Sequence, residues 1–533
     1  MASSPNTQHK PSFFGTASIV MLAFVLSRVS GLVRVALLAG AFGASYELDA
    51  FNAAMQVPDT LYILVAGGAL ASAFIPTFTA YLARGDQRTA WQVASAVTNL
   101  VLVVTLVASL IVALFAPWLV SFALAPGYDA PTQALIVGLL RWMLASTVIF
   151  GVSGLLMGIL NANDRFLLPA LAPTMYNLGI IGGVLLFHRR WGIHSAALGT
   201  VAGALLHLLV QIPALRGLNW RYKPILGLRL EGVREVGRLM GPRVLGLAIT
   251  QLNFWVNINL GSRILVAGVV TALKNGWLLM LLPQGVFAQA IATVLLPSFS
   301  AHAAREERGA VRSALRSAVQ VLVYLTLPST IGLIVLGRPL VELFLMRGEF
   351  DALDAAMASW ALAWYAVGLV AHSVLEVVTR AFYAMHDTAT PVWVGGGAMA
   401  LNVVLSLLFV QLFEWAGMRS PAYEPWMPLG GLALANSVAT ILETLTLTWL
   451  VRRRLNGLED GLLWASLWRT IAGATAMCGV LLAYVRWMPV RSAWVLGGGG
   501  IVLGAGTFFL STLLLRSPDL AFVLDAVRRR LRR

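Results

Sequence analysis

Charged residues are scarce in this sequence. Asp, Glu, Lys and Arg make up 11% of the 533 residues, whereas 59% of the residues are hydrophobic. Soluble domains carry about 25% charged residues, so this composition excludes an ordinary soluble protein. The single cysteine, Cys478, excludes an intramolecular disulfide, and its apolar surroundings indicate a packing role.

Motifs of catalysis and cofactor binding are also missing. The 7 histidines show neither an HExxH motif nor a paired metal-ligand spacing. No GxxxxGK[ST] phosphate loop is present, so the chain does not bind ATP in the manner of a P-loop transporter. We therefore expect no cofactor, no metal and no enzymatic activity.

Long apolar runs are what the sequence does contain. A bilayer core about 30 Å thick is spanned by roughly 20 apolar residues in a helix. Runs of this length predict an all-α integral membrane protein with about fourteen transmembrane helices and no separate soluble domain. The helices are expected near 15–42, 50–82, 90–118, 131–160, 165–187, 193–215, 238–262, 272–302, 313–337, 355–386, 390–415, 427–452, 463–487 and 492–515.

The net charge of +15 lies mostly on one set of alternate loops. Because cytoplasmic loops are rich in Lys and Arg, an even number of spans predicts that both termini are cytoplasmic. The basic segments then favour contact with anionic membrane lipids rather than nucleic acid. They are Arg84 with Arg88, residues 216–243, Arg305 to Arg316, Arg452 to Arg454 and Arg528 to Arg533.

Three pairs of similar segments follow one another in the same order. AFIPTFTAYLARGD (73–86) resembles VLLPSFSAHAAREE (294–307), NANDRFLLP (161–169) resembles AMHDTATP (384–391), and GIHSAALGTVAG (192–203) resembles GGLALANSVAT (430–440). The three pairs predict two six-helix halves related by an axis along the membrane normal. Paired repeats of this kind are typical of transporters.

These repeats predict the domain organisation. We expect a cytoplasmic N-terminal tail (1–14), an N-lobe (15–215), a basic linker (216–237), a C-lobe (238–455), an added helix pair (456–515) and a basic cytoplasmic tail (516–533). In the linker, basic residues alternate with aromatic and aliphatic ones. This mixture is typical of a segment in the membrane interface, and a plain solvated linker is the alternative.

Two arginines lie within the first predicted span. Arg28 and Arg34 each cost about 2.5–3.5 kcal/mol to insert, so such residues usually face a bundle interior or a wet cavity. A spacing of six places them about 120° apart on a regular helix. Ser30 and Gly31 lie between them and are candidates for a kink. A guanidinium group suits bidentate contact with phosphate, and pairing with a carboxylate or carbonyl is the alternative.

Polar residues also mark the second and seventh spans. Asp49 precedes the second span and is a candidate gate or counter-ion residue, with helix capping as the alternative. Gln251, Asn253 and Asn257 lie in the seventh span, and the two asparagines share a helix face. They are candidates to line a cavity, and hydrogen bonding between helices is the alternative. Support roles are expected for the internal charges Arg141 and Glu443.

The chain resembles the MurJ (MviN) family of lipid II flippases, within the multidrug/oligosaccharidyl-lipid/polysaccharide exporter superfamily. The resemblance covers nearly the whole chain and rests on the following segments: SRVSGLVR (27–34), ELDAFNAAMQVPDTLYILVAGGALASAFIPTF (47–78), PALAPTMYNLGII (169–181), LLVQIPAL (208–215), VLLPSFSAHAA (294–304) and AFYAMHDTATPVWVG (381–395).

The resemblance implies two lobes around a central cavity and a groove for a polyprenyl tail at the last two spans. It implies alternating access in a bacterial inner membrane, with a polyprenyl-diphosphate-linked peptidoglycan precursor moved from the inner to the outer leaflet. Arg28 and Arg34 match arginines thought to meet the diphosphate, and Asp49 matches an acidic family residue. Proteins of cell-wall synthesis are the implied partners.

The sequence departs from the family at charged positions, which favours a diverged member. Uncharged residues stand where the family has charges: Tyr62, Ile63, Leu278, Leu281 and Val35. The alternatives are therefore a paralogue that exports another lipid-linked glycan or a drug-like cation, and a non-transporting scaffold of cell-wall synthesis.

Overall fold

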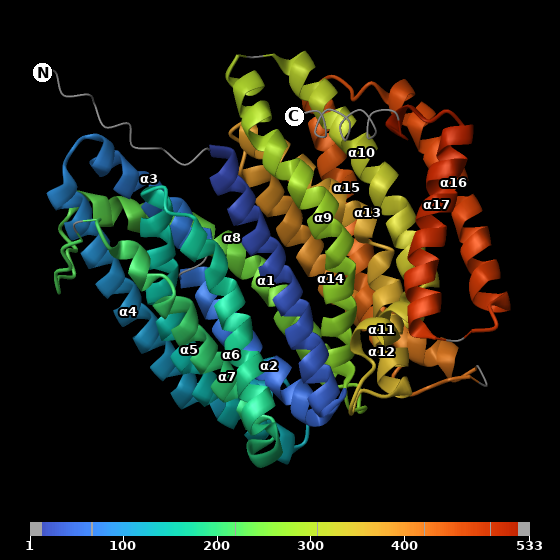
Figure 1. Cartoon of the computed structure of the whole chain (residues 1–533), viewed down its shortest axis with the longest axis horizontal. Coiled ribbons are helices and arrows are strands. Elements are labelled where there is room, and N and C mark those ends of the chain that lie inside the picture. The colour runs from blue at the N-terminus through green and yellow to red at the C-terminus, as the bar shows by residue number, and fades with distance from the viewer. Residues whose placement is uncertain are drawn as a thin grey trace, which may run out of the picture. The chain divides into compact units, whose positions relative to one another are not determined.

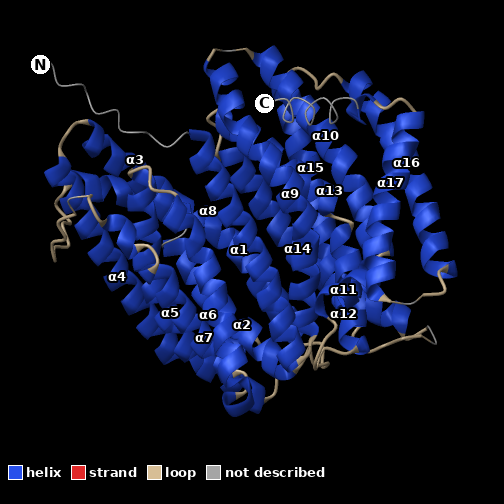
Figure 2. Cartoon of the chain, in the orientation of Figure 1, coloured by secondary structure: helices blue, strands red, loops and turns tan. Residues whose placement is uncertain are grey.

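The computed structural model describes residues 13–65, 68–218, 220–305, 307–419, 422–490 and 492–520. Every regular element in these ranges is a helix, which confirms the all-α prediction (Figure 2). Most of the predicted terminal tails, including Arg528 to Arg533, lie outside the described residues.

The chain divides into two compact units, and α8 (Glu231–Ser262) passes from the first unit to the second after Gln251. The first unit also holds the chain up to Phe42, Ala50–Leu124 and Asp129–Gln251. Its helices are α1 (Phe13–Phe42), α2 (Tyr46–Val65), α3 (Gly68–Ala83), α4 (Gln87–Trp118), η1 (Leu119–Leu124), α5 (Ala130–Ala162), α6 (Leu167–Trp191), α7 (His194–Leu209) and η2 (Ile212–Leu215).

The second unit contains Leu252–Arg533 and two short segments from the first part of the chain, Gly43–Asp49 and Ala125–Tyr128. The first of these segments includes the start of α2. The helices that belong wholly to this unit are α9 (Val269–Ala304), α10 (Arg308–Val335), α11 (Gly337–Leu345), α12 (Ala352–Ala366), α13 (Leu369–Ala384), α14 (Ala389–Gly417), α15 (Leu429–Arg454), α16 (Asp460–Trp487), η3 (Trp494–Gly499) and α17 (Gly500–Leu514).

The described helices account for the fourteen predicted spans. Eleven are long and apolar enough to cross a membrane, and α12 with α13 forms a twelfth span bent by 47°. The other two predicted spans correspond to α2 with α3, and to α8. These helices are more polar, since α2 carries Glu47, Asp49 and Asp59 within 20 residues. The short α11, between the ninth and tenth spans, was not predicted.

The two matched segments predicted from the sequence end their helices, α3 and α9, with the same backbone hydrogen bond. After α3 the backbone N–H of Asp86 donates to the carbonyl of Tyr81, and after α9 the N–H of Glu307 donates to that of His302. Both bonds span five residues, as in a Schellman closure. They fall at equivalent positions of AFIPTFTAYLARGD and VLLPSFSAHAAREE.

A second pair of closures lies in the other matched turn. Asp164 and His386 both adopt a left-handed backbone, with φ of 58° and 60°. In each turn the next residue donates its N–H five residues back, from Arg165 to Leu160 and from Asp387 to Phe382. Hydrogen bonds from Thr390, together with Arg454, hold the pKa of Asp387 at about 2.

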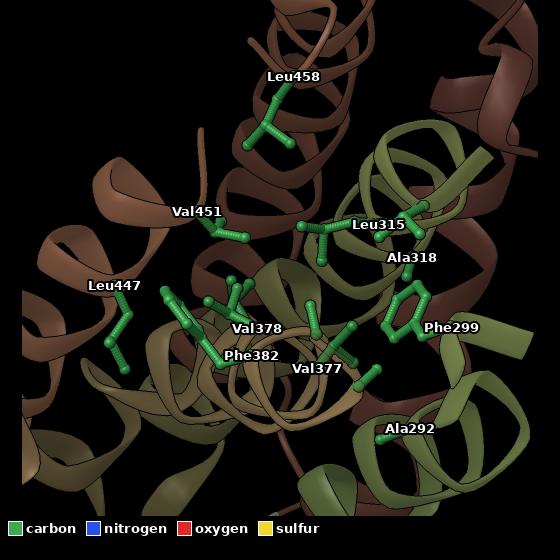
Figure 3. Packing of buried hydrophobic residues seen from close by; sticks show 14 of the residues in the cluster. Ala292, Phe299, Leu315, Ala318, Val377, Val378, Phe382, Leu447, Val451 and Leu458 are labelled. Atoms are coloured by element: carbon green, nitrogen blue, oxygen red, sulfur yellow. The ribbon is translucent and has the colours of Figure 1, made fainter. Parts of the chain in front are cut away.

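Helix pairing also recurs in the two units. In the first unit α5 packs on α4 and α7, and α6 packs on α7; in the second unit α13 packs on α10 and α15, and α14 packs on α15 (Figure 1). Figure 3 shows part of the core of the second unit, where Phe299, Leu315 and Phe382 are buried together. This correspondence agrees with two similar six-helix halves, to which α16 and α17 are added.

The linker between the halves is fastened to α4. Asn99 donates its side-chain amide to the carbonyls of Lys223 and Ile225 at 3.0 and 2.8 Å, and accepts from the Tyr222 hydroxyl at 2.7 Å. The Lys223 N–H donates to Ser95. Residues 220–227 therefore lie on the first unit as a segment without regular secondary structure, and the predicted linker ends within the first turns of α8.

Glycines allow α6 and α7 to approach closely. A Cβ built on Gly179 would lie 2.2 Å from the Cα of Gly203, whereas one on Gly182 in the same helix meets nothing within 4 Å. We predict that Gly179→Leu separates the two helices and destabilises the protein by about 1–3 kcal/mol or more. Gly182→Leu is the matched control.

Thermal unfolding of the purified protein in detergent measures this effect. The Tm of Gly179→Leu should fall by several degrees while that of Gly182→Leu stays near the wild-type value. Equal Tm values for the two variants would contradict the predicted close packing.

Candidate functional site

The two candidate arginines lie in different surroundings on α1. Arg28 is exposed in the described chain and Arg34 is half-buried. The Cζ atom of Arg34 lies 5.7 Å from the ring centroid of Tyr176 on α6. The Nε of Arg34 is buried and has no hydrogen-bond partner among the described residues. This N–H is therefore a donor for which the described residues supply no acceptor.

Between the two arginines, α1 is fixed to α6 through one amide. Asn177 donates to the Ser30 hydroxyl at 2.9 Å and to the carbonyl of Ser27 at 3.2 Å. Gly31 lies beside the same amide, since a Cβ there would be 3.6 Å from the Asn177 nitrogen. Ser30 and Gly31 do not interrupt the helix, which runs from Phe13 to Phe42. Arg28 and Arg34 therefore keep the angular separation of about 120° expected for a regular helix.

Asp59 is a charged neighbour of this site that the sequence reasoning did not single out. It is half-buried on α2, and Tyr176 lies within the electrostatic reach of both Asp59 and Arg34. The signal was present in the sequence, because an acid inside an apolar span is costly and usually functional. The proline before it, Pro58, breaks the helical hydrogen-bond pattern at the same point.

An aromatic row lies next to Asp59 in the first unit. The ring centroid of Phe150 lies 5.1 Å from those of Tyr62 and Tyr176, and 5.2 Å from that of His207. Tyr62, at one of the positions where the family resemblance implies a charge, packs against the ring of Phe150. The first unit therefore offers a guanidinium group with an aromatic face beside it, a combination that suits an anionic group attached to an apolar or sugar-like body.

Asp49 is completely buried in the second unit. Its carboxylate accepts from the Tyr128 hydroxyl at 2.9 Å, from the Gly268 N–H at 2.9 Å and from the Thr271 N–H at 2.7 Å. Gly268 directly precedes α9 and Thr271 lies in its first turn, so Asp49 caps the N-terminus of a helix far along the chain. Its own helix is capped by Ser45, which accepts from the Leu48 N–H.

Gln251 is buried in the first unit and bonds to α2. Its Oε1 accepts from the Gln56 amide at 3.2 Å and from the Thr60 hydroxyl at 3.5 Å. These bonds correspond to the interhelical alternative. The amide of Gln56 and the hydroxyl of Thr60 therefore form a row of polar groups along the middle of α2.

Asn253 and Asn257 lie together in the second unit, as their spacing predicts. The Asn257 amide donates to the Asn253 Oδ1 at 3.3 Å, and the Oδ1 of Asn257 is buried without a partner among the described residues. Leu278 lies on α9, and the exposed Lys274 lies one turn earlier in the same helix. Lys274 is a second charge that the sequence reasoning passed over.

The expected support residues have ordinary surroundings. The Nε of Arg141 donates to the carbonyl of Ala113 on α4 at 3.1 Å. Glu443 on α15 is half-buried, and a Cβ on Gly395 would lie 3.1 Å from its Oε1. Within the described ranges, no cluster of three or more His, Cys, Asp or Glu side chains is placed to hold a metal ion.

Comparisons with known proteins agree with this architecture. Residues 38–497 match the family model described as lipid II flippase MurJ. A relative from Burkholderia cenocepacia named lipid II flippase MurJ is 30% identical over 482 residues, which cover 88% of this chain and 89% of the relative.

Solved structures give the same result for the fold. A structure titled lipid II flippase MurJ, inward closed conformation, superposes with a TM-score of 0.77 at 25% identity, and the match covers 93% of this chain and 98% of that one. A multidrug resistance MATE family transporter of the MOP superfamily shares the fold alone, with a TM-score of 0.66 at 16% identity over 83% of this chain and 99% of the other. This protein is therefore a multi-pass membrane transporter, not an enzyme, and belongs to the lipid II flippase MurJ family.

Proposed function

We propose that this protein moves lipid II, a polyprenyl-diphosphate-linked peptidoglycan precursor, from the inner to the outer leaflet by alternating access. The observation that carries this proposal is family membership over most of the chain. The half-buried Arg34, with one N–H for which the described residues supply no acceptor, supports it from the geometry of the first unit. The proposal places the protein in a bacterial inner membrane with both termini in the cytoplasm.

In this proposal Arg28 and Arg34 contact the diphosphate. A diphosphate offers several acceptor oxygens, so two guanidinium groups that point in different directions can each bind one side of it. The ring of Tyr176 then shields one face of Arg34 from water, which strengthens the electrostatic contact. Asn177 keeps both arginines in position by fixing the helical turn between them.

The polar residues of α2 and α8 have accessory roles in the proposal. Asn253 and Asn257 contribute amide groups to the transport path, and Gln251 links α8 to α2 through Gln56. Asp49 acts as a gate residue whose closed state is the cap on α9, because a motion that separates it from Gly268 and Thr271 must break both bonds.

Anionic lipids and proteins of cell-wall synthesis are the proposed partners. Arg221 and Arg229 are exposed within the linker, and the exposed Trp220 and Tyr222 are the neighbours of Arg221 in sequence. Basic and aromatic side chains together favour the headgroup region of a membrane. The linker is therefore the proposed lipid-contacting surface of the first unit.

Loss of Arg34 should abolish transport. We predict that Arg34→Ala fails to support growth of a host depleted of its own lipid II flippase, because the diphosphate loses a charge-assisted contact worth about 1.5–3 kcal/mol. Arg34→Lys should restore growth partly, since it keeps the charge without the planar fork. Arg141→Ala, which removes an arginine bonded to a carbonyl, is the matched control and should grow normally.

The same strains separate the alternatives. If Arg34→Ala supports growth as well as wild type, the protein acts as a scaffold or does not use this arginine. If the wild type itself fails while folding normally, a thermal shift with other polyprenyl-diphosphate lipids and with drug-like cations identifies a diverged exporter.

Replacement of Asp49 should weaken the start of α9. Asp49→Asn leaves one acceptor oxygen for three donors, so at least one buried N–H loses its partner at a cost of about 1–3 kcal/mol. Tyr128→Phe removes only one hydroxyl and should cost less, about 0.5–1.5 kcal/mol. The Tm values in detergent should therefore rank wild type above Tyr128→Phe and Tyr128→Phe above Asp49→Asn.

Growth of the depleted host tests the gate role of Asp49 separately. A gate predicts that Asp49→Asn impairs growth more than Tyr128→Phe at matched protein levels. Unchanged Tm and growth in Asp49→Asn would contradict both the cap and the gate.

A further inference from the structure

A stripe of basic residues runs along the first turns of α10. Arg308, Arg312, Arg316 and Gln320 follow one another at intervals of four, which places them on one side of the helix. The last three of these residues face the start of α16. Both Arg312 and Arg316 form ion pairs with Glu459, and Gln320 donates to the carbonyl of Leu462 at 3.0 Å.

Two cations here share one carboxylate. The Nε of Arg312 lies 3.6 Å from Glu459 Oε1, and Arg316 contacts Oε2 through Nη1. The Nε atoms of both arginines are buried and have no hydrogen-bond partner in the part of the chain that the structure describes. Each guanidinium carries five N–H donors, so one carboxylate cannot satisfy both groups. One further monoanion would balance the charge of this trio.

The backbone conformation of Glu459 is uncommon for a residue with a side chain. Glu459 adopts a left-handed conformation, with φ 54° and ψ 53°, and its side chain does not cap α16. Such a conformation is costly for a residue other than glycine and is retained where the surroundings enforce it. The N-terminus of α16 also carries a partial positive charge, which attracts an anion to the same place.

The length of α10 indicates that the trio lies at the level of the lipid headgroups. α10 has 28 residues, a length of about 42 Å at 1.5 Å per residue, whereas the hydrocarbon core is about 30 Å thick. The apolar part of α10 follows Arg316, so the first two turns extend beyond the core. The exposed Trp464 in the first turns of α16 agrees with this level, because tryptophan collects at the membrane interface.

We propose that Arg312, Arg316 and Glu459 form a binding site for the phosphate diester of an anionic phospholipid. The phosphate carries the single negative charge that the trio lacks, and its oxygens accept from the donors that Glu459 leaves unused. Leu315 and Leu458 precede Arg316 and Glu459 in sequence and are buried in the core of the second unit (Figure 3). This burial fixes the backbone from which the arginine and glutamate side chains extend. With the orientation proposed above, this end of α10 meets the cytoplasmic leaflet.

Lipid retention by the delipidated full-length protein tests the site. Native mass spectrometry with phosphatidylglycerol and phosphatidylcholine of equal chain length should show preferential retention of phosphatidylglycerol by wild type. R312Q/R316Q should reduce that preference at least fivefold. R419Q is the matched control: it removes an exposed arginine stacked on Trp415, outside the basic segments expected to contact anionic lipids, and should leave the preference unchanged.

Changes at Glu459 separate a lipid site from a purely structural ion pair. E459Q frees both arginines and should raise phosphatidylglycerol retention, whereas an ion pair with no ligand predicts a lower Tm and unchanged retention. The neutral triple variant R312Q/R316Q/E459Q avoids an unpaired carboxylate and should also lose the preference. Retained preference in the double or triple variant, or an equal loss in R419Q, overturns the proposal.

Inorganic phosphate distinguishes a lipid headgroup from a free anion. Millimolar phosphate should stabilise wild type less than phosphatidylglycerol does in a thermal shift assay. Equal stabilisation by phosphate alone, with no further effect of the lipid, overturns the assignment to a phospholipid.

Discussion

The ends of helices set the main constraint on this structure. A helix in a bilayer satisfies its own backbone along its length, but the groups at its ends have neither helical partners nor, within the hydrocarbon, water. The described turns meet this demand with repeated closures, such as those at Asp86, Arg165 and Asp387. At the start of α9 the backbone N–H groups that lack helical partners donate to Asp49. Pro283 and Pro297 lie further along the same helix. The repeated architecture thus depends on how each helix ends.

The same constraint explains what most charged side chains do. Arg165 donates to the carbonyls of Ala214 and Arg216, and Arg141 donates to the carbonyl of Ala113, so these arginines satisfy backbone groups. Arg34 differs because its Nε has no such acceptor among the described residues. Arg34 shares this feature with Arg312 and Arg316 on α10, and in the proposed function its N–H meets the anionic substrate. The location of a charge in a span is therefore less informative than the presence of a partner for it.

The apolar runs were sufficient to predict the helices, because the length of a span follows from the bilayer thickness. The repeats predicted the two halves, because turn motifs such as NANDRFLLP require particular residues. Breaks inside spans could not be predicted, since the bend between α12 and α13 comes at Val367 and Gly368 without a proline. The partner of Asp49 was equally hidden, as nothing local links it to Gly268 or Thr271, 219 and 222 residues away. Asp59 was visible in the sequence and was passed over.

The two short segments that belong to the second unit affect the order of assembly. Gly43–Asp49 and Ala125–Tyr128 are synthesised with the first half of the chain, yet their partners lie beyond residue 252. At a synthesis rate of about 5–20 residues per second, Asp49 spends roughly 10 to 45 s without the α9 backbone that it caps. During that interval the carboxylate can accept from the Tyr128 hydroxyl but not from the backbone N–H groups of Gly268 and Thr271. The first half of this membrane protein is therefore synthesised before the contacts of Asp49 with the start of α9 can form.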